Sequence, residues 1–335
     1  MKPTIKDVAK RSGVSISTVS RVLNTPELVT ETKREKVLKV IETLGYHPNA
    51  LARGLIQKRT HSLGVLIPDV SNLVFAEVFR GMEDAAHETG QNLVICNTDL
   101  NKERMMSYFK ILKEKQVDGM IFTSEPVYPD YYELLKELQI PVVLAATHSH
   151  DYELPSVKVN DEPASYDATA YLIKMGHRHI GMISGPSHDP IAGLPRMQGF
   201  LRAMRMHDLP HSVERNVVYG HYRYEDGYEA MEELYQLNDK LSAVLCASDE
   251  MALGAISYLD SIGINVPEDV SVMGYDNTRL AHVCIPKLTT VSQPLHAIGY
   301  EAVNKLEMLL SKGEVDELRT YLPHQLVIRD SVKAP

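Results

Sequence analysis

The first sixty residues combine a polar helix face with an excess of positive charge. They hold 12 Lys and Arg against 5 Asp and Glu, whereas the other 275 residues hold 23 against 39. A compact basic segment on an acidic body is typical of nucleic-acid binding, because Lys and Arg release counterions from a phosphate backbone. Helical spacing turns four neighbouring side chains outward: Ile16, Ser17, Ser20 and Arg21. These side chains predict contacts with the edges of DNA bases.

The chain lacks the sequence motifs of the common catalytic sites. It contains no GxxxxGK[ST] phosphate loop, no GxGxxG after a strand, no HExxH and no GxSxG. His148 and His150 come nearest to metal-ligand spacing, but isolated histidines in loops are usually structural. The three cysteines are too few and too scattered for a disulfide framework or a structural zinc. We therefore expect no enzyme, no cofactor and no metal site.

Two short helices separated by a glycine turn are expected to present the polar face. Thr4 can cap the first helix, and Asp7 at its third position can reach back in a capping box. Gly13 ends that helix, and a second helix runs from about Ser17 to Leu23. This spacing is typical of a helix-turn-helix, whose second helix enters the major groove of DNA. A solvated basic tail is the alternative, but a tail should lack such apolar periodicity.

A third helix should complete a small core with the first two. It begins near Thr30 or Thr32, with Thr32-x-x-Glu35 as a capping box, and ends at Gly45. The three helices then form one compact domain over residues 1–48.

The segment after Pro48 predicts one more short helix, capped by Asn49 and carrying Ala52 and Leu55. Helices below about 12 residues are marginal in water, so this one should need DNA or a second copy of itself to become ordered. We interpret residues 49–60 as a hinge helix and linker.

Three runs of residues carry a specific resemblance that extends over essentially the whole chain. They are TIKDVAKRSGVSISTVSRVLN, VTETKREKVLKVIETLGYHPNALARGL and HSLGVLIPDVSN. The chain resembles the LacI/GalR family of bacterial transcriptional regulators, whose second helix reads operator DNA and whose hinge-helix leucine enters the minor groove. The resemblance implies DNA contacts at Thr4, Ser15, Ile16, Ser17, Thr18, Ser20, Arg21, Asn24, Asn49, Ala52 and Leu55. Leu55 would be the apolar wedge that unstacks a base step in exchange for wider contact with a bent duplex.

From His61 onward, short apolar runs alternate with helical stretches. The expected strands are Leu63–Ile67, Leu93–Cys96, Gly119–Phe122, Val142–Ala146, Ile180–Ile183, Ala243–Cys246 and Val270–Gly274. The expected helices include Val74–His87, Glu103–Lys113, Ser165–Met175 and Met251–Ile262. Continuous apolar strands separated by amphipathic helices predict parallel sheets with right-handed crossovers. Ligands then lie at the carboxyl ends of the strands.

The resemblance implies the complete fold: an all-α helix-turn-helix domain and hinge helix, followed by an α/β body like the periplasmic sugar-binding proteins. Two parallel-sheet subdomains of that body are joined by three crossing segments and enclose an effector cleft. We assign residues 61–160 with 290–320 to the N-terminal subdomain and residues 161–289 with 321–335 to the C-terminal subdomain.

Several residues match effector-binding positions of that family. The resemblance implies a cleft lined by Asn72, Phe75, Arg196, Tyr222, Ser248, Asp276 and Gln293. A guanidinium and a carboxylate can together bind vicinal hydroxyls, while an aromatic face packs on the C–H surface of a sugar. Asp249, next to Ser248, is expected to cap the helix that follows.

Two positions depart from the sugar-binding pattern. Asn72-Leu73-Val74-Phe75 replaces the Asn-Pro-Phe-Phe of many members, and Ala145-Ala146 stands where a carboxylate often follows the fourth strand. The second change removes an acceptor for a ligand hydroxyl. Two kinds of effector therefore remain open for the α/β body: a sugar or sugar phosphate that binds in the cleft, and a protein corepressor.

The motifs IPDVSN, NTDLNKE, KQVDGMIF, PVVLAA, SDEMALG and YDNTRLA resemble the catabolite control branch of the family. That branch binds the phosphocarrier HPr when HPr is phosphorylated on serine. The resemblance implies that Arg279 meets the phosphate and that Asp69 and Asp99 meet a basic surface of HPr. Gln325, however, replaces an arginine of the Leu-Pro-His-Arg motif in that branch, which removes one basic partner of the phosphate.

These expectations combine into a homodimeric repressor of carbohydrate metabolism on a pseudo-palindromic operator, because a two-fold dimer presents two identical recognition helices. A sugar-binding protein without DNA activity is the alternative of another class, but it would not need the basic head. The start MKPTIKDVAK lacks the apolar core of a signal peptide, so we expect a cytoplasmic protein without a membrane segment.

Overall fold

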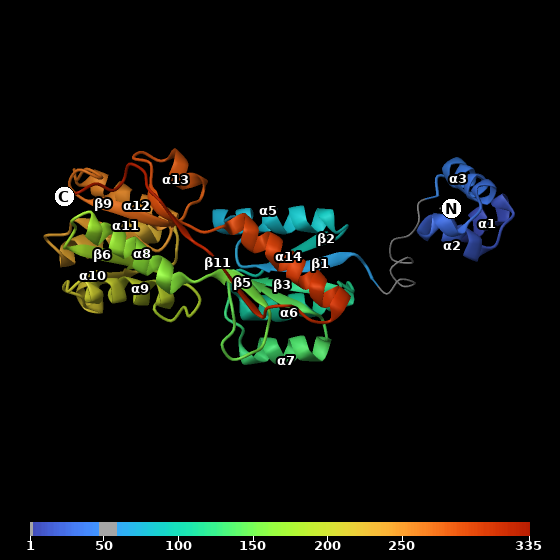
Figure 1. Cartoon of the computed structure of the whole chain (residues 1–335), viewed down its shortest axis with the longest axis horizontal. Helices are drawn as coiled ribbons and strands as arrows, with labels where there is room; N and C mark the ends of the chain where they lie inside the picture. The colour runs from blue at the N-terminus through green and yellow to red at the C-terminus, as the bar shows by residue number, and fades with distance from the viewer. Residues whose placement is uncertain (1–2, 47–58) are drawn as a thin grey trace. The chain divides into compact units, whose positions relative to one another are not determined.

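The chain folds into two units. The computed structural model describes residues 3–46 and 59–335, and these divide into one unit that ends at His61 and one that begins at Ser62 (Figure 1). No helix within the described ranges is long and apolar enough to cross a membrane.

The first unit is a small helical domain. Its elements are α1 (Ile5–Ser12), α2 (Ile16–Asn24), the 3-10 turn η1 (Pro26–Leu28) and α3 (Glu31–Leu44). Val8 of α1, Val19 of α2 and Val37 of α3 are fully buried and meet in one core. The helix-turn-helix predicted from the sequence is therefore present, and its second helix is one residue longer at each end than expected.

The helix ends follow the predicted capping with one exception. Thr4 and Asp7 form the expected capping box, and the hydrogen bonds from Thr4 lower the pKa of Asp7. Gly13 ends α1 in the left-handed conformation at φ 64°. The capping box expected at Thr32 and Glu35 is wrong, because α3 already begins at Glu31 and Thr32 lies inside its first turn.

The first lobe of the body is a parallel sheet covered on both faces. Its strands, in spatial order, are β11 (Arg319–Leu322), β5 (Ser156–Val159), β4 (Val142–Ala145), β3 (Gly119–Thr123), β1 (Ser62–Ile67) and β2 (Asn92–Asn97). Figure 1 shows α5 (Leu73–Glu88) and α14 (Leu295–Lys312) on one side of this sheet and α6 (Lys102–Glu114) and α7 (Pro129–Leu138) on the other. We call this part the first lobe.

The second lobe repeats the arrangement with one antiparallel edge. Its strands, in spatial order, are β12 (Gln325–Val327), β10 (Thr289–Ser292), β9 (Ser271–Asp276), β8 (Ala243–Cys246), β6 (Ile180–Ser184) and β7 (Val217–Tyr219). Only the β10–β12 pair of this described sheet is antiparallel. Its helices are α8 (Asp161–Lys174), α9 (Gly193–Met206), α10 (Val213–Asn216), α11 (Tyr224–Leu237), α12 (Asp249–Ser261) and α13 (Arg279–Val283).

Each predicted strand is present, but five observed strands were not expected. They are β5, β7, β10, β11 and β12. These strands are three or four residues long, and four of them carry polar residues, so they lack the continuous apolar run that identified the others. Thr289 and Thr290 of β10, for example, are fully buried although both are polar.

The chain passes between the lobes three times within the described body. It leaves the first lobe between Val159 and Asp161, returns between Ser292 and Leu295, and leaves again between Leu322 and Gln325. The second and third crossings therefore lie a few residues beyond the expected boundaries at 290 and 321. Strand pairing explains the difference, since β10 pairs with β9 through Ser292 and β11 pairs with β5 through Leu322.

Candidate functional site

The second helix presents its polar side chains from a firmly capped start. Ser15 is the N-cap of α2, and its hydroxyl accepts a hydrogen bond from the backbone N–H of Thr18 at 3.1 Å. The same hydroxyl lies 2.8 Å from the hydroxyls of both Ser17 and Thr18. Near the other end, Asn24 Nδ2 donates to Ser20 Oγ at 3.3 Å. These bonds fix the positions of polar groups along α2.

The exposure of α2 fits a surface that can meet a macromolecule. Ile16 is 45% exposed, and Ser17 and Arg21 are exposed beside it. Exposed cations elsewhere in this unit include Lys6, Lys10, Arg11, Lys33, Lys36 and Lys39. The predicted hinge contacts at Asn49, Ala52 and Leu55 lie outside the described residues.

Arg196 is the centre of a buried polar cluster in the second lobe. It lies in the first turn of α9, and its Nε donates to Asp161 Oδ1 at 2.8 Å. Its Nη1 donates to the backbone carbonyl of Ala247 at 2.6 Å, just after β8. The guanidinium stacks on the ring of Tyr275 at 3.7 Å from the ring centroid. The side chain of Arg196 is only 8% exposed, so these partners replace most of its contact with water.

Asp161 neutralises two cations at once. Its Oδ1 faces Arg196, and its Oδ2 lies 3.0 Å from Lys158 Nζ, which also donates to the carbonyl of Ile191 at 3.0 Å. Tyr275 donates its hydroxyl to Asp161 Oδ1 at 3.0 Å. Burial alone would raise the pKa of Asp161, but the two cations outweigh it and hold the pKa below its usual value.

Asp276 lies on the other side of the same guanidinium with weaker compensation. Its Oδ1 is 4.0 Å from Arg196 Nη1 and accepts a hydrogen bond from Gln293 Nε2 at 2.7 Å. Burial, with a smaller contribution from the nearby Asp249 carboxylate, outweighs the attraction of Arg196 and raises the pKa of Asp276 to about 8. The structure therefore brings together Arg196, Asp276 and Gln293, which the resemblance had selected.

Ser248, and not Asp249, caps the helix that follows β8. Ser248 is the N-cap of α12 and accepts from the backbone N–H of Met251 at 3.1 Å. The expectation that Asp249 caps this helix is wrong, because its carboxylate accepts from Thr278 N at 2.6 Å and from Thr290 Oγ1 at 2.6 Å. Asp249 thus braces the segments after β9 and within β10.

Tyr222 and Asp189 form a second, half-buried polar group. The Tyr222 hydroxyl donates to Asp189 Oδ2 at 2.5 Å, and Ser248 Oγ donates to the Tyr222 carbonyl at 3.1 Å. Asp189 also accepts from the backbone N–H groups of Ile191 at 2.9 Å and Gly193 at 3.1 Å. The ring of Tyr222 is accordingly held by its hydroxyl and by the packing around it.

Asn72 and Phe75 lie in the first lobe, at the start of α5. The side chain of Asn72 caps this helix by accepting from the backbone N–H of Val74 at 2.9 Å. Phe75 is half-buried against the main core. Both residues therefore have local structural contacts, whereas the other five predicted cleft residues belong to or adjoin the second lobe.

Asp69 joins the two lobes directly. It follows β1 in the first lobe, and its Oδ2 lies 2.6 Å from Arg223 Nη2 at the N-cap of α11 in the second lobe. Ser71 donates to the other oxygen from its backbone N–H at 2.9 Å and its hydroxyl at 2.6 Å. The hydrogen bonds from Ser71 and the contact with Arg223 lower the pKa of Asp69. The carboxyl ends of the two sheets therefore face each other here.

Asp99 and Arg279, the other two predicted contacts with HPr, lie on separate lobes. Asp99 follows β2 with a φ of 53°, and its carboxylate contacts Arg104 and Asn97. Arg279 is the first residue of α13 and is exposed.

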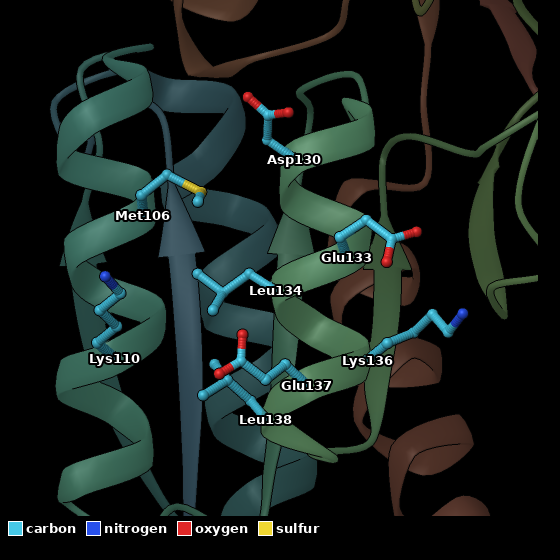
Figure 2. A pocket seen from close by; sticks show the side chains of 8 residues that line it. All are labelled: Met106, Lys110, Asp130, Glu133, Leu134, Lys136, Glu137 and Leu138. Carbon is cyan, nitrogen blue, oxygen red and sulfur yellow. The ribbon is translucent and has the colours of Figure 1, made fainter.

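A groove with a defined lining lies in the first lobe, between α6 and α7. Its volume is about 810 Å³, and Figure 2 shows the side chains of both helices that line it. Its lining comprises Met106, Lys110, Asp130, Glu133, Leu134, Lys136, Glu137 and Leu138. Both signs of charge alternate along it, and nothing in the lining selects one ligand chemistry.

His148 and His150, the two histidines whose spacing came nearest to that of metal ligands, contact each other. His148 Nε2 lies 2.7 Å from His150 Nε2, and burial lowers the pKa of His148 to about 4. Within residues 3–46 and 59–335, no three His, Cys, Asp or Glu side chains are arranged to hold a metal ion.

Three charged residues of these groups were not expected from the sequence: the buried Lys158 and Asp161 and the half-buried Asp189. Lys158 is in a strand that was not expected, and it is only 3% exposed. An available signal was the position of Asp161, which follows an apolar strand end and begins a helix, as ligand-site residues in parallel sheets often do.

Comparison with known protein families supports both units. Residues 4–49 match the family described as "Bacterial regulatory proteins, lacI family", and residues 169–332 match "Periplasmic binding protein-like domain". Catabolite control protein A of Priestia megaterium is 41% identical over 333 residues, covering 99% of this chain and 100% of that protein.

Solved structures show the same architecture. The Lac repressor dimer bound to operator and the anti-inducer ONPF is similar with a TM-score of 0.90 at 25% identity, covering 100% of both chains. A complex of the transcriptional regulator CelR with cellobiose has a TM-score of 0.76 at 30% identity, covering 98% of this chain and 99% of that one.

Proposed function

This chain belongs to the LacI family of bacterial regulatory proteins, and on that premise we propose that it represses genes of carbohydrate metabolism from a pseudo-palindromic operator as a homodimer. It is a DNA-binding transcriptional regulator and not an enzyme. Because its target is operator DNA, it works in the cytoplasm.

The α2 surface supports operator recognition. Ile16, Ser17 and Arg21 are exposed on one short helix within a basic unit, the arrangement that enters a major groove in helix-turn-helix proteins. Arg21 supplies the long donor side chain that can pair with a guanine edge. We propose Leu55 as the apolar side chain that enters the minor groove and unstacks a base step.

A second copy of the chain is supported by an exposed apolar patch on the second lobe. Val283, the last residue of α13, is 64% exposed, and Ile285, two residues later, is 92% exposed. Large exposed apolar side chains that lie together mark interaction surfaces. Two copies related by a two-fold axis would present two α2 helices to two operator half-sites.

The cleft between the lobes is the proposed effector site, and the buried Arg196 cluster is the observation that carries this proposal. Arg196, Asp276 and Gln293 meet at the carboxyl ends of the second sheet, the edge where open parallel sheets bind ligands. A sugar or sugar phosphate fits the hydrogen-bonding groups there, and the relative CelR is described in complex with cellobiose. Ligand binding would change lobe closure and so operator affinity.

Serine-phosphorylated HPr is the second candidate effector. The similarity to catabolite control protein A favours it, and Arg279 is exposed as a phosphate partner must be. The commitment of Asp69 to Arg223 weighs against it, because a basic surface of HPr would have to displace that arginine.

The test begins with an operator enriched from random duplex DNA by the purified chain. Operator affinity is then measured at one stated salt concentration with sugars, with sugar phosphates and with serine-phosphorylated HPr. We expect a small molecule to shift the affinity and Arg196→Ala to abolish the shift. A shift by HPr alone that Arg279→Ala removes would instead establish the second candidate, and no enriched operator at all would refute the proposed function.

A further inference from the structure

The positions where the proposed cleft could hold an anion are already filled by carboxylates of the chain itself. We propose that the effector is uncharged and that the cleft excludes sugar phosphates and other anions, an inference that rests on the cleft being the effector site.

The first filled position is the pair of buried cations. Arg196 and Lys158 are the natural partners for a phosphate, and each lies within 3.0 Å of one oxygen of Asp161. Asp161 is 4% exposed, and a phosphate that displaced it would leave this carboxylate buried without compensation. The two cations are thus satisfied before any ligand arrives.

The second filled position is the N-terminus of α9. Free backbone N–H groups and the helix dipole make such a terminus an anion-binding site. Here the carboxylate of Asp189 accepts from the N–H groups of Ile191 and Gly193, at 2.9 and 3.1 Å, and from the hydroxyl of Tyr222. Asp189 therefore stands where a ligand phosphate would bind this helix.

The remaining groups near the cluster favour a neutral ligand. Asp276 lies 4.0 Å from Arg196, and because burial raises its pKa to about 8 it is mostly an uncharged carboxyl group near pH 7. Arg223, the cation that bridges the lobes, is paired with Asp69 at 2.6 Å. An anion would thus meet the carboxylates of Asp161 and Asp189 and cations that are already paired, whereas neutral hydroxyls can donate to these carboxylates and accept from Gln293.

Calorimetry on the full chain with matched ligands tests the exclusion directly. The pairs are glucose with glucose 6-phosphate and fructose with fructose 1,6-bisphosphate. We expect each phosphorylated sugar to bind at least ten-fold more weakly than its neutral partner or not at all. A phosphorylated sugar that binds more tightly than its partner, with the binding lost in Arg196→Ala, would overturn the proposal.

A second experiment uses sulfate as the probe and needs no effector. Asp189→Ala removes the carboxylate from the N-terminus of α9, so the melting temperature of this variant should be lower than that of the wild type. Adding sulfate should raise the melting temperature of the variant more than that of the wild type, when both are compared at equal ionic strength. Asp239→Ala, which removes an exposed carboxylate of the same lobe, is the control and should respond to sulfate as the wild type does.

Equal sulfate responses of Asp189→Ala and the control would contradict the assignment of this terminus as a filled anion site. If no sugar of either kind alters operator affinity, the cleft function itself fails, while the sulfate experiment still decides whether Asp189 occupies an anion site.

Discussion

Asp161 and Asp276 flank one guanidinium, yet their pKa values shift in opposite directions. Asp161 contacts both Arg196 and Lys158 within 3.0 Å, and these attractions overcome its burial. Asp276 has Arg196 only at 4.0 Å and lies near Asp249, so burial dominates and its pKa rises to about 8. Distance to a cation, rather than depth of burial, therefore separates the two carboxyl groups.

The raised pKa of Asp276 predicts a dependence of stability on pH. A carboxyl group with a folded pKa near 8 and a usual value of 3.8 stabilises the fold fully below about pH 4, and this contribution is lost as the pH rises through 8. We expect Asp276→Asn to lose less stability than the wild type between pH 5 and pH 8. Urea unfolding at both pH values measures the change in the free energy of unfolding, and Asp239→Asn, at an exposed position, is the control. An unchanged loss would contradict the raised pKa.

Replacing Arg21 should weaken operator binding without destabilising the fold. Arg21→Ala should weaken binding to an enriched operator by about ten- to a hundred-fold, since a paired arginine–guanine contact contributes about 1–3 kcal/mol. Its thermal unfolding should match the wild type because Arg21 is exposed. A gel-shift titration measures the affinity, and Lys39→Ala, an exposed cation of α3, should weaken it less. Wild-type affinity in the Arg21 variant would refute the role of α2.

Only some residues of the Arg196 cluster could be predicted from the sequence. Arg196, Asp276 and Gln293 were found because they match positions of a known family. Asp161, Asp189 and Lys158 were not found, because their importance comes from contacts between distant segments: Lys158 and Ile191 are 33 residues apart, and Tyr222 and Asp189 are also 33 apart. Spacing along the chain does not reveal such contacts.

At the scale of elements, glycines allow the long helices to cross at short distance. A Cβ on Gly299 of α14 would lie 1.8 Å from the carbonyl oxygen of Val78 in α5, and one on Gly81 would lie 1.9 Å from the carbonyl oxygen of His296. In the second lobe, a Cβ on Gly227 of α11 would lie 2.2 Å from the carbonyl oxygen of Met251. Backbone-to-backbone contact thus sets these crossings.

This contact predicts the effect of adding one methyl group. Gly299→Ala should destabilise the chain by about 1–3 kcal/mol, because backbone atoms of α5 would have to move. Glu301→Ala, on the exposed face of the same helix, should change stability by less than about 0.5 kcal/mol. Urea unfolding followed by circular dichroism gives both values. Equal stability of the two variants would show that the crossing relaxes without cost.

The elements themselves were predictable where apolar patterns were long. The strand over Leu63–Ile67 and the second helix of the head follow from spacing alone. β11 and β12 were not predicted because both are short edge strands, with the sequences RTYL and QLV. Edge strands are only partly buried and tolerate polar residues. Their sheet membership depends on pairing with β5 and β10, which the local sequence does not encode.

At the scale of the whole body, the Asp69–Arg223 pair is a direct contact between the two lobes. Arg223 is 61% exposed and Asp69 is 26% exposed, so water and salt screen the attraction. Exposed ion pairs contribute about 0.2–1 kcal/mol, which is enough to bias an equilibrium between open and closed lobes without fixing it. The pair is therefore suited to a body that must change closure.

Arg223→Gln should loosen this contact without unfolding either lobe. We expect faster hydrogen exchange at the backbone N–H groups of Val70 and Ser71, which are hydrogen-bonded beside Asp69. Raising the salt concentration should speed exchange there in the wild type and have a smaller effect in the variant. Arg215→Gln, an exposed arginine of α10, serves as the control. Identical exchange in all three proteins would rule out a contribution of this pair to closure.

The three crossings also govern what a truncated chain would contain. A ribosome that has synthesised residues up to Lys312 has completed α14, but each described sheet still lacks an edge strand, β11 in one and β12 in the other. A premature stop codon in this last stretch would therefore damage both lobes together. Neither lobe is encoded by one uninterrupted stretch of the chain, so a truncation cannot remove one lobe and leave the other complete.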